Sequence, residues 1–216
     1  TVAMYNGLAD QKLRTAIDTQ TAHLQIHASG FQQNKDIRLY MENADAIQAE
    51  AESMSAVKAL APRLVATGMA ATSNANAGVQ LNGINPEKER EVSTIYQSIV
   101  EGDYFGETKR NQVLISSRTA KKLKVGLNGK VIITMQDIHG EIVGAAFRVS
   151  GIFKTSHSMF DEANMFVRRQ DLARILSMDG HTNEMAIRLH DIEAAASVQD
   201  ELTRQFGPSD TDVQTW

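Results

Sequence analysis

The sequence predicts an α+β fold in which a split, ferredoxin-like pair of strand-helix-strand units carries an inserted, small, strand-rich α/β subdomain. One strand-helix-strand pattern lies near each end of the chain, at residues 22–72 and 185–213. Residues 111–155, between the two, hold the densest run of strand and turn signals. Split units of this kind usually pair into one antiparallel or mixed sheet with both helices on one face. We therefore expect two subdomains, with both chain ends in the first.

Composition excludes several classes of function. The chain has 216 residues and 42% hydrophobic residues, which is enough for a proper core. Its net charge of −4 provides no basic stripe, so nucleic-acid binding is set aside. The absence of cysteine excludes a disulfide scaffold, a thiolate metal site and a cysteine nucleophile. No run reaches about 18 consecutive apolar residues, so we expect no segment that spans a bilayer.

The first unit begins after a predicted amphipathic helix, in which Val2, Tyr5, Ala9, Leu13 and Ala16 recur at helical spacing. Residues 23–28 alternate between apolar and polar side chains, which predicts a half-buried strand. Asn43 or Asp45 can cap the next helix, and Pro62 closes it. Its predicted apolar face contains Ile47, Ala51, Met54, Val57 and Ala61. Strands at 64–72 and 79–83 follow.

The second half repeats the same kinds of signal. Asn85-Pro86 predicts the start of a helix, with asparagine as the cap and proline at the first helical position. Residues 165–167 read as a strand, and a short helix follows with Leu172, Ile175 and Leu176 facing inward. A strand over 185–189 leads to a helix that Asp191 caps and that Gly207-Pro208 ends before Val213.

The central block is predicted to be a strand, a short helix and a hairpin. Residues 113–115 form the strand, and Ser117 can cap the helix. The first strand of the hairpin is predicted from the alternation of Val131, Ile133 and Met135 with Ile132, Thr134 and Gln136. Residues 137–140 are predicted to turn, and the return strand covers 143–149.

These motifs together resemble a known family. The order of strand, AKKL helix (120–123), GKV turn (129–131), hairpin and FRVSGIF (147–153) resembles the periplasmic core domain of MacB-like and lipoprotein-release-type (FtsX-like) ABC transporter permeases. IVEGDYF (99–105) resembles the family's I-V-x-G-x-Y-F, and residues 161–167 resemble its D-E-x-x-x-F-V. VQTW (213–216) resembles the segment that leads into the second membrane helix. The family often has glycine where Ser116 and Ala22 stand, which concerns the backbone alone.

The resemblance implies how the chain divides into subdomains, where the domain lies in the cell and which partners it has. It implies a stalk helix over 1–21, a porter-like subdomain from 22–88 and 183–216, and an inserted subdomain over 89–182. The domain would lie on the periplasmic face of the bacterial inner membrane, excised from a permease. Implied partners are a cytoplasmic ATPase subunit, a second permease copy or paralogue, and a periplasmic lipoprotein, adaptor or carrier. Trp216 suits a membrane-water interface.

No catalytic, metal or cofactor site is expected. The sequence has no P-loop, nucleophile-elbow, zincin or dinucleotide motif. His23 and His27 share one face of the first strand, but no acid or cysteine is adjacent in sequence, so we interpret them as polar surface. ATP hydrolysis would belong to a separate subunit or domain.

Three apolar residues are candidates for contact with a partner or substrate. Met159 and Phe160 lie in a polar loop predicted over 154–164, and Phe31 follows Ser29-Gly30. Large apolar side chains exposed in loops usually mark an interaction site. The alternative is that all three fold back onto their subdomains.

The resemblance implies that the domain couples cytoplasmic ATP hydrolysis to a periplasmic conformational change that moves a lipoprotein or other amphiphile. Residues 21–34, TAHLQIHASGFQQN, are more similar to lipoprotein-release permeases than to the efflux type. The alternatives are a tripartite efflux domain, or a signalling domain that activates a periplasmic partner such as a cell-wall hydrolase.

Overall fold

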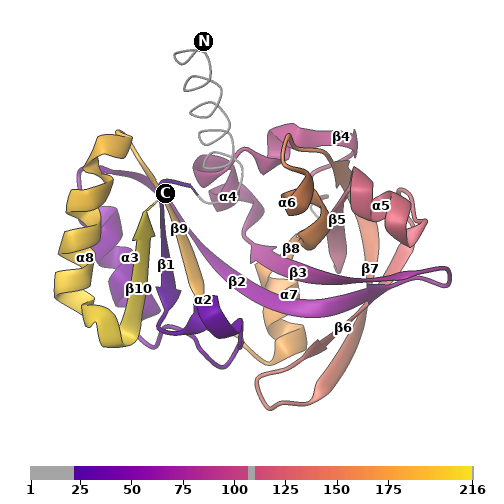
Figure 1. Ribbon diagram of the computed structural model, residues 1–216, viewed down its shortest axis with the longest axis horizontal. Coiled ribbons are helices and arrows are strands. Elements are labelled where there is room, and N and C mark those ends of the chain that lie inside the picture. Colours follow the sequence, from indigo (N-terminus) through magenta and orange to yellow (C-terminus); the bar gives the residue numbers. More distant parts are fainter. Residues whose placement is uncertain (1–21, 107–109, 216) are drawn as a thin grey trace, which may run out of the picture.

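The computed structural model describes residues 22–106 and 110–215, and their strands form one sheet in the order β10-β1-β9-β2-β3-β8-β5-β7-β4, with β6 paired to β2 and β7 (Figure 1). The predicted helix over 1–21 and Trp216 lie outside the described residues. The strands are β1 (Leu24–Ala28), β2 (Val57–Ala71), β3 (Asn76–Ile84), β4 (Ile99–Gly102), β5 (Gln112–Ser116), β6 (Lys130–Gln136), β7 (Ile142–Phe153), β8 (Asn164–Arg168), β9 (Glu184–Leu189) and β10 (Thr211–Thr215).

Short helices connect these strands. The α-helices are α2 (Phe31–Asn34), α3 (Ala44–Ser53), α4 (Pro86–Val92), α5 (Ser117–Leu123), α6 (Ser158–Ala163), α7 (Arg169–Leu176) and α8 (Ala195–Asp210). Two 3-10 helices, η2 (Ile95–Ser98) and η3 (Ile192–Ala194), are also present. The Asn85 side chain accepts from the backbone N–H groups of Glu87 and Lys88, as its position before Pro86 predicts. Gly207 interrupts α8 with a φ of 71°, where the helix was expected to end.

The strands at the two ends of the chain form a ferredoxin-like half. β10, β1, β9 and the first part of β2 are neighbours in that order, and every pair is antiparallel. Apolar side chains of α3 and α8 pack with those of the strands, and both helices lie together at the left of Figure 1. Two strand-helix-strand units therefore interleave into one sheet, and the predicted fold class is confirmed.

Six strands, β2, β3, β8, β5, β7 and β6, form a closed ring that we call the central ring. β2 pairs with β3, β3 with β8, β8 with β5, β5 with β7, β7 with β6, and β6 with β2. A ring of this kind encloses a core and leaves its members no free edge inside the ring. Residues of α5 and α7, including Leu123, Leu172 and Leu176, complete that core.

The strand β2 belongs to both halves. It pairs with β9 as far as Arg63, and with β3 from Leu64 onward. Residues 64–84 therefore pair with the central ring, and their apolar side chains join its core. β2 thus changes partners at residues 63–64, whereas the resemblance placed the division of the chain between residues 88 and 89. This strand of 15 residues is long enough to pair with β9 in the ferredoxin-like half and with β3 in the ring.

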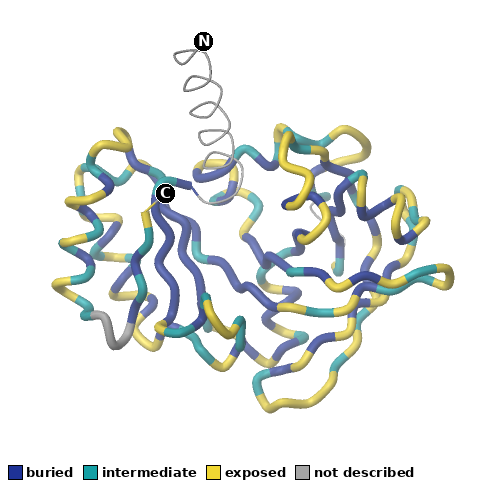
Figure 2. Tube along the Cα trace, in the orientation of Figure 1, coloured by how far each residue is buried: buried dark blue, intermediate teal, exposed yellow. Residues whose placement is uncertain are grey.

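Three local predictions were wrong. The helix ends at Ser53 instead of Ala61, because residues 57–63 extend and pair with β9, a partner more than 120 positions away. The cap of α5 is Ser116, whose side chain accepts from the N–H of Thr119, and not Ser117. β1 is buried on both faces (Figure 2), because α3 and α8 cover one face while α2 and Glu184 cover part of the other.

Candidate functional site

Phe31 is fully buried. Its ring is 0% exposed and stacks on the His27 imidazole, with 6.2 Å between the ring centroids. The Lys35 ammonium lies 5.2 Å from the same ring centroid. The expectation of an exposed aromatic contact is therefore wrong for Phe31, because the left-handed turn at Gly30 directs α2 and its first side chain back onto β1.

Met159 and Phe160 have opposite environments. The polar loop predicted over 154–164 contains α6, which places the two consecutive side chains in different directions. Phe160 is 5% exposed and packs with Phe153 and Phe166, so its expected exposure is wrong. Met159 is 76% exposed, and its role as a contact residue stays a prediction.

Other exposed apolar residues lie on the outer face of the ring, where sequence reasoning did not look for them. Met69, Ile132 and Ile142 are the large ones, and Ile142 is 80% exposed. They belong to three adjacent strands, β2, β6 and β7, and alternate with core residues such as Ile133. The alternating pattern signalled one outward face, but only the strand pairing shows that the outward residues of three strands are neighbours.

A buried cluster of charges lies where β2 changes partners. Arg63, 4% exposed, donates to Glu89 of α4 from Nε at 3.0 Å and from Nη2 at 2.6 Å. Its Nη1 donates to Glu184 of β9 at 2.9 Å. Nε2 of His27, on β1, lies 3.1 Å from the second oxygen of Glu184. We call these four residues the junction cluster.

The junction cluster corrects the interpretation of His27 as polar surface. His27 is fully buried beside an acid that is 157 positions away in the chain, and no local pattern signals such a pair. Within the described residues, no group of three or more His, Asp and Glu side chains could hold a metal ion. The acids of the junction cluster are occupied by Arg63 and His27, so the cluster supplies structural cross-links.

The charges of the junction cluster stabilise one another. Burial alone would raise the pKa of Glu184, but the hydrogen bond with His27 and the charge of Arg63 outweigh it and lower that pKa to about 2. Burial also disfavours the Arg63 cation, yet Glu89 and Glu184 together raise the pKa of Arg63 above its ordinary value. Arg63 and Glu184 are therefore charged at neutral pH, and the cluster ties β1, β2, β9 and α4 together.

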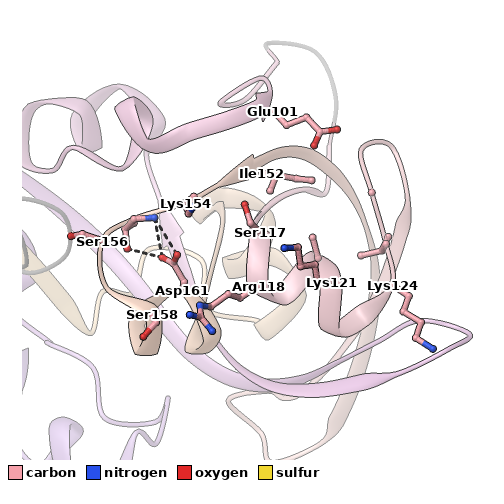
Figure 3. Close-up of a pocket in the computed structure, with 14 residues that line it drawn as sticks. Glu101, Ser117, Arg118, Lys121, Lys124, Ile152, Lys154, Ser156, Ser158 and Asp161 are labelled. Carbon is pink, nitrogen blue, oxygen red and sulfur yellow. Dashed lines mark hydrogen bonds between the residues drawn. The ribbon is translucent and has the colours of Figure 1, made fainter.

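An open cleft of about 910 Å³ lies beside α5, the end of β7 and α6, outside the central ring (Figure 3). Four cations line it, namely Arg118, Lys121, Lys124 and Lys154, and we call it the basic cleft. Its two acids are Glu101 and Asp161. Dashed lines in Figure 3 mark hydrogen bonds to Asp161. One of its hydrogen bonds comes from Thr155, whose Oγ1 donates to the Asp161 carboxylate at 2.6 Å.

Residues 1–205 match the family described as the MacB-like periplasmic core domain. The chain belongs to this family. Two lipoprotein-releasing system transmembrane proteins LolC, from Xylella fastidiosa strains Temecula1 and 9a5c, are 28% and 27% identical to it over 135 residues. That alignment covers 59% of this chain and 32% of the length of each relative.

Solved structures show the same fold. The periplasmic region of MacB from Actinobacillus actinomycetemcomitans superposes with a TM-score of 0.60 at 13% identity, covering 95% of this chain and 94% of that one. The extracellular domain of the ABC-type transporter YknZ from Gram-positive bacteria gives a TM-score of 0.57 at 18% identity, covering 91% and 100%. The predicted family, a MacB-like and LolC-like periplasmic core domain, is thus confirmed. Within residues 22–106 and 110–215, no helix is long and apolar enough to cross a membrane.

Proposed function

We propose that this periplasmic core domain couples cytoplasmic ATP hydrolysis to the movement of a lipoprotein or another amphiphilic substrate. The observation that carries the proposal is the junction cluster, in which Arg63 binds acids from two different elements at the point where the two halves of the domain meet. A mechanical element must transmit a displacement without absorbing it. A buried, fully paired ionic joint resists bending there, because opening it would expose or unpair charges.

The two outermost described segments lie side by side, which suits the same role. Leu24 of β1 is paired with Thr215 of β10. In the proposed permease, the first and second membrane helices connect through these two strands. A displacement of the membrane helices would therefore enter the sheet at one place, and the ferredoxin-like half would pass it through β2 to the central ring.

The proposed cargo and partners rest on similarity. The relatives with 28% and 27% identity are named as lipoprotein-releasing system proteins, which favours a lipoprotein over other amphiphiles. We propose a cytoplasmic ATPase subunit and a second permease copy or paralogue as partners. The domain itself would contribute no catalytic group and no cofactor, and ATP hydrolysis would occur in the partner subunit.

The experiment uses the full-length permease with its ATPase, reconstituted in liposomes that contain a lipoprotein. Glu89→Gln removes one charge of the junction cluster, and Glu201→Gln removes one charge of an exposed pair with Arg204 on α8 as the matched control. We expect Glu89→Gln to lower the amount of lipoprotein released per ATP hydrolysed, while ATP hydrolysis continues. The control should keep the wild-type ratio.

Two results would contradict the proposal. An unchanged ratio of release to hydrolysis in a folded Glu89→Gln protein would mean that the joint does not transmit force. Hydrolysis without any lipoprotein release by the wild type would remove the cargo assignment. Photocrosslinking from the exposed positions Met159 and Ile142 then separates transport from signalling, because capture of one soluble hydrolase would indicate a signalling domain.

A further inference from the structure

The basic cleft has a local positive charge, opposite in sign to the net charge of the whole chain. The protein has a net charge of −4, yet four cations line this one depression. Arg118 and Lys121 are three positions apart on α5, which places them on the same face of the helix. Lys124 caps the end of that helix, and Lys154 follows β7 on the neighbouring wall.

The lysines of the basic cleft have no acidic partner among the residues that the structure describes. In the described ranges 22–106 and 110–215, none of Lys121, Lys124 and Lys154 forms an ion pair. Arg118 pairs with Glu162 at 2.9 Å, but both side chains are more than half exposed, so the pair is weak and exchangeable. The cleft therefore presents positive charge that an incoming anion can neutralise.

The walls of the basic cleft are held in place. The carbonyl of Asp161 accepts hydrogen bonds from Ser116 Oγ and from Thr119 Oγ1, which ties α6 to the start of α5. The Asp161 carboxylate accepts from the N–H and the hydroxyl of Thr155. Asp161 is buried and its carboxylate is occupied, so Glu101 on β4 is the exposed acid of the cleft lining.

We propose that the basic cleft binds an acidic segment of a partner protein. Figure 3 shows that the cations do not converge on one point, since Lys124 points away from Lys121. A single phosphate or carboxylate would therefore find no cradle, whereas acids spaced along an extended chain can reach separate lysines. The exposed hydroxyls of Ser156 and Ser158 are placed to bond the backbone of such a segment. This inference concerns a partner contact and does not depend on which cargo the permease moves.

The test titrates the 216-residue chain with a short fluorescein-labelled peptide of alternating Glu and Ser, by fluorescence anisotropy at low ionic strength. The variant Lys121→Gln/Lys124→Gln/Lys154→Gln should bind about fivefold more weakly, since three exposed pairs of a few tenths of a kcal/mol each add up to about 1 kcal/mol. Glu101→Gln should bind more tightly than the wild type, because it removes the exposed acid of the cleft lining. Added salt should weaken binding in every case.

The matched control removes three exposed lysines that do not line the cleft, in Lys58→Gln/Lys122→Gln/Lys130→Gln. It has the same net charge as the cleft variant, and Lys122 neighbours Lys121 on the same helix. Retention of wild-type affinity by the control supports a defined site. Equal losses in both variants would show a non-specific charge effect and overturn the proposal.

Two competitors identify the class of anion. Displacement of the peptide by millimolar inorganic phosphate would mean a small-anion site and overturn the assignment to a protein segment. Binding to vesicles of anionic phospholipid, with no binding of the peptide, would replace the acidic segment by a membrane surface. The supporting result is peptide binding that neither phosphate nor anionic phospholipid vesicles displace, and that is lost in the cleft variant but kept in the control variant.

Discussion

The side-chain amide of Asn183 bonds both backbone groups of Val65, donating to its carbonyl and accepting from its N–H, each at 2.8 Å. Val65 is the second residue of β2 after its last pairing with β9. Asn183 directly precedes β9 and is fully buried. The amide thus takes the place of a neighbouring strand where β2 has left one, and it satisfies backbone groups that burial would otherwise penalise.

Replacement of Asn183 by alanine should destabilise the domain strongly. Two buried backbone groups would lose their partner, at a cost of about 2–4 kcal/mol in the free energy of unfolding. Urea denaturation monitored by circular dichroism measures it. Asn74→Ala, in the exposed turn between β2 and β3, is the control and should have little effect. Equal stabilities of the two variants would contradict the role of Asn183.

Replacement of Arg63 by methionine tests the junction cluster. The change leaves Glu89 and Glu184 buried without their cation, which should cost about 3–5 kcal/mol in the free energy of unfolding. Arg204→Met breaks an exposed ion pair with Glu201 and should cost less than about 1 kcal/mol. Thermal unfolding of both variants gives the comparison. A small effect of Arg63→Met would mean that the cluster does not stabilise the joint.

Acid should weaken the fold through Glu184. Its pKa is lowered from 4.5 in the unfolded chain to about 2 in the folded one, so its contribution is complete above about pH 4.5. The contribution is lost as the pH falls from 4.5 toward 2, because the unfolded chain then binds the proton more readily. The groups that face Glu184 are His27 and Arg63, with Lys35 nearby, and Arg63 is also bound to Glu89.

The measurement compares the unfolding free energies of wild type and Glu184→Gln at several pH values. The difference should be largest near neutral pH and should shrink between about pH 4.5 and 2, since the glutamine has no proton to bind. Glu162→Gln, which removes an exposed acid, should follow the wild-type pH profile. A constant difference between wild type and Glu184→Gln across this range would contradict the low pKa of Glu184.

The sequence was sufficient for most of the strands and helices and for the presence of a strand-helix-strand unit near each end of the chain. Alternation in residues 185–189 and the cap at Asn85 are local signals, and the structure forms the strand and the helix that they predict. The two patterns predict that the end strands share one sheet, and the structure adds their order, β10-β1-β9-β2.

Contacts between distant residues could not be predicted in this way. The spacing of Val57 and Ala61, which extends the predicted apolar helix face, is equally compatible with a strand, and pairing with β9 decides for the strand. The pairing of His27 with Glu184 and the bonds of Asn183 to Val65 also join residues more than 100 positions apart. The burial of Phe160 depends on the short helix α6. The polar residues of this segment had predicted a loop instead of a helix.

Phe160 and Met159 give the sharpest test of the site, because they are consecutive and differ in burial. Phe160→Ala removes a ring that packs against Phe153 and Phe166, and it should lower the free energy of unfolding by about 3–5 kcal/mol. Met159→Ala removes an exposed side chain and should change it by less than about 0.5 kcal/mol.

The same pair separates structural from functional effects in the full-length permease. Phe160→Leu keeps most of the apolar volume, so it should retain the fold and the activity of the wild type. Met159→Ser leaves the fold intact, and a loss of transport in that variant would identify Met159 as a contact residue. Equal destabilisation by Phe160→Ala and Met159→Ala in urea would contradict the burial of the Phe160 ring. That result would instead support the sequence-based prediction that Phe160 is an exposed contact for a partner or substrate.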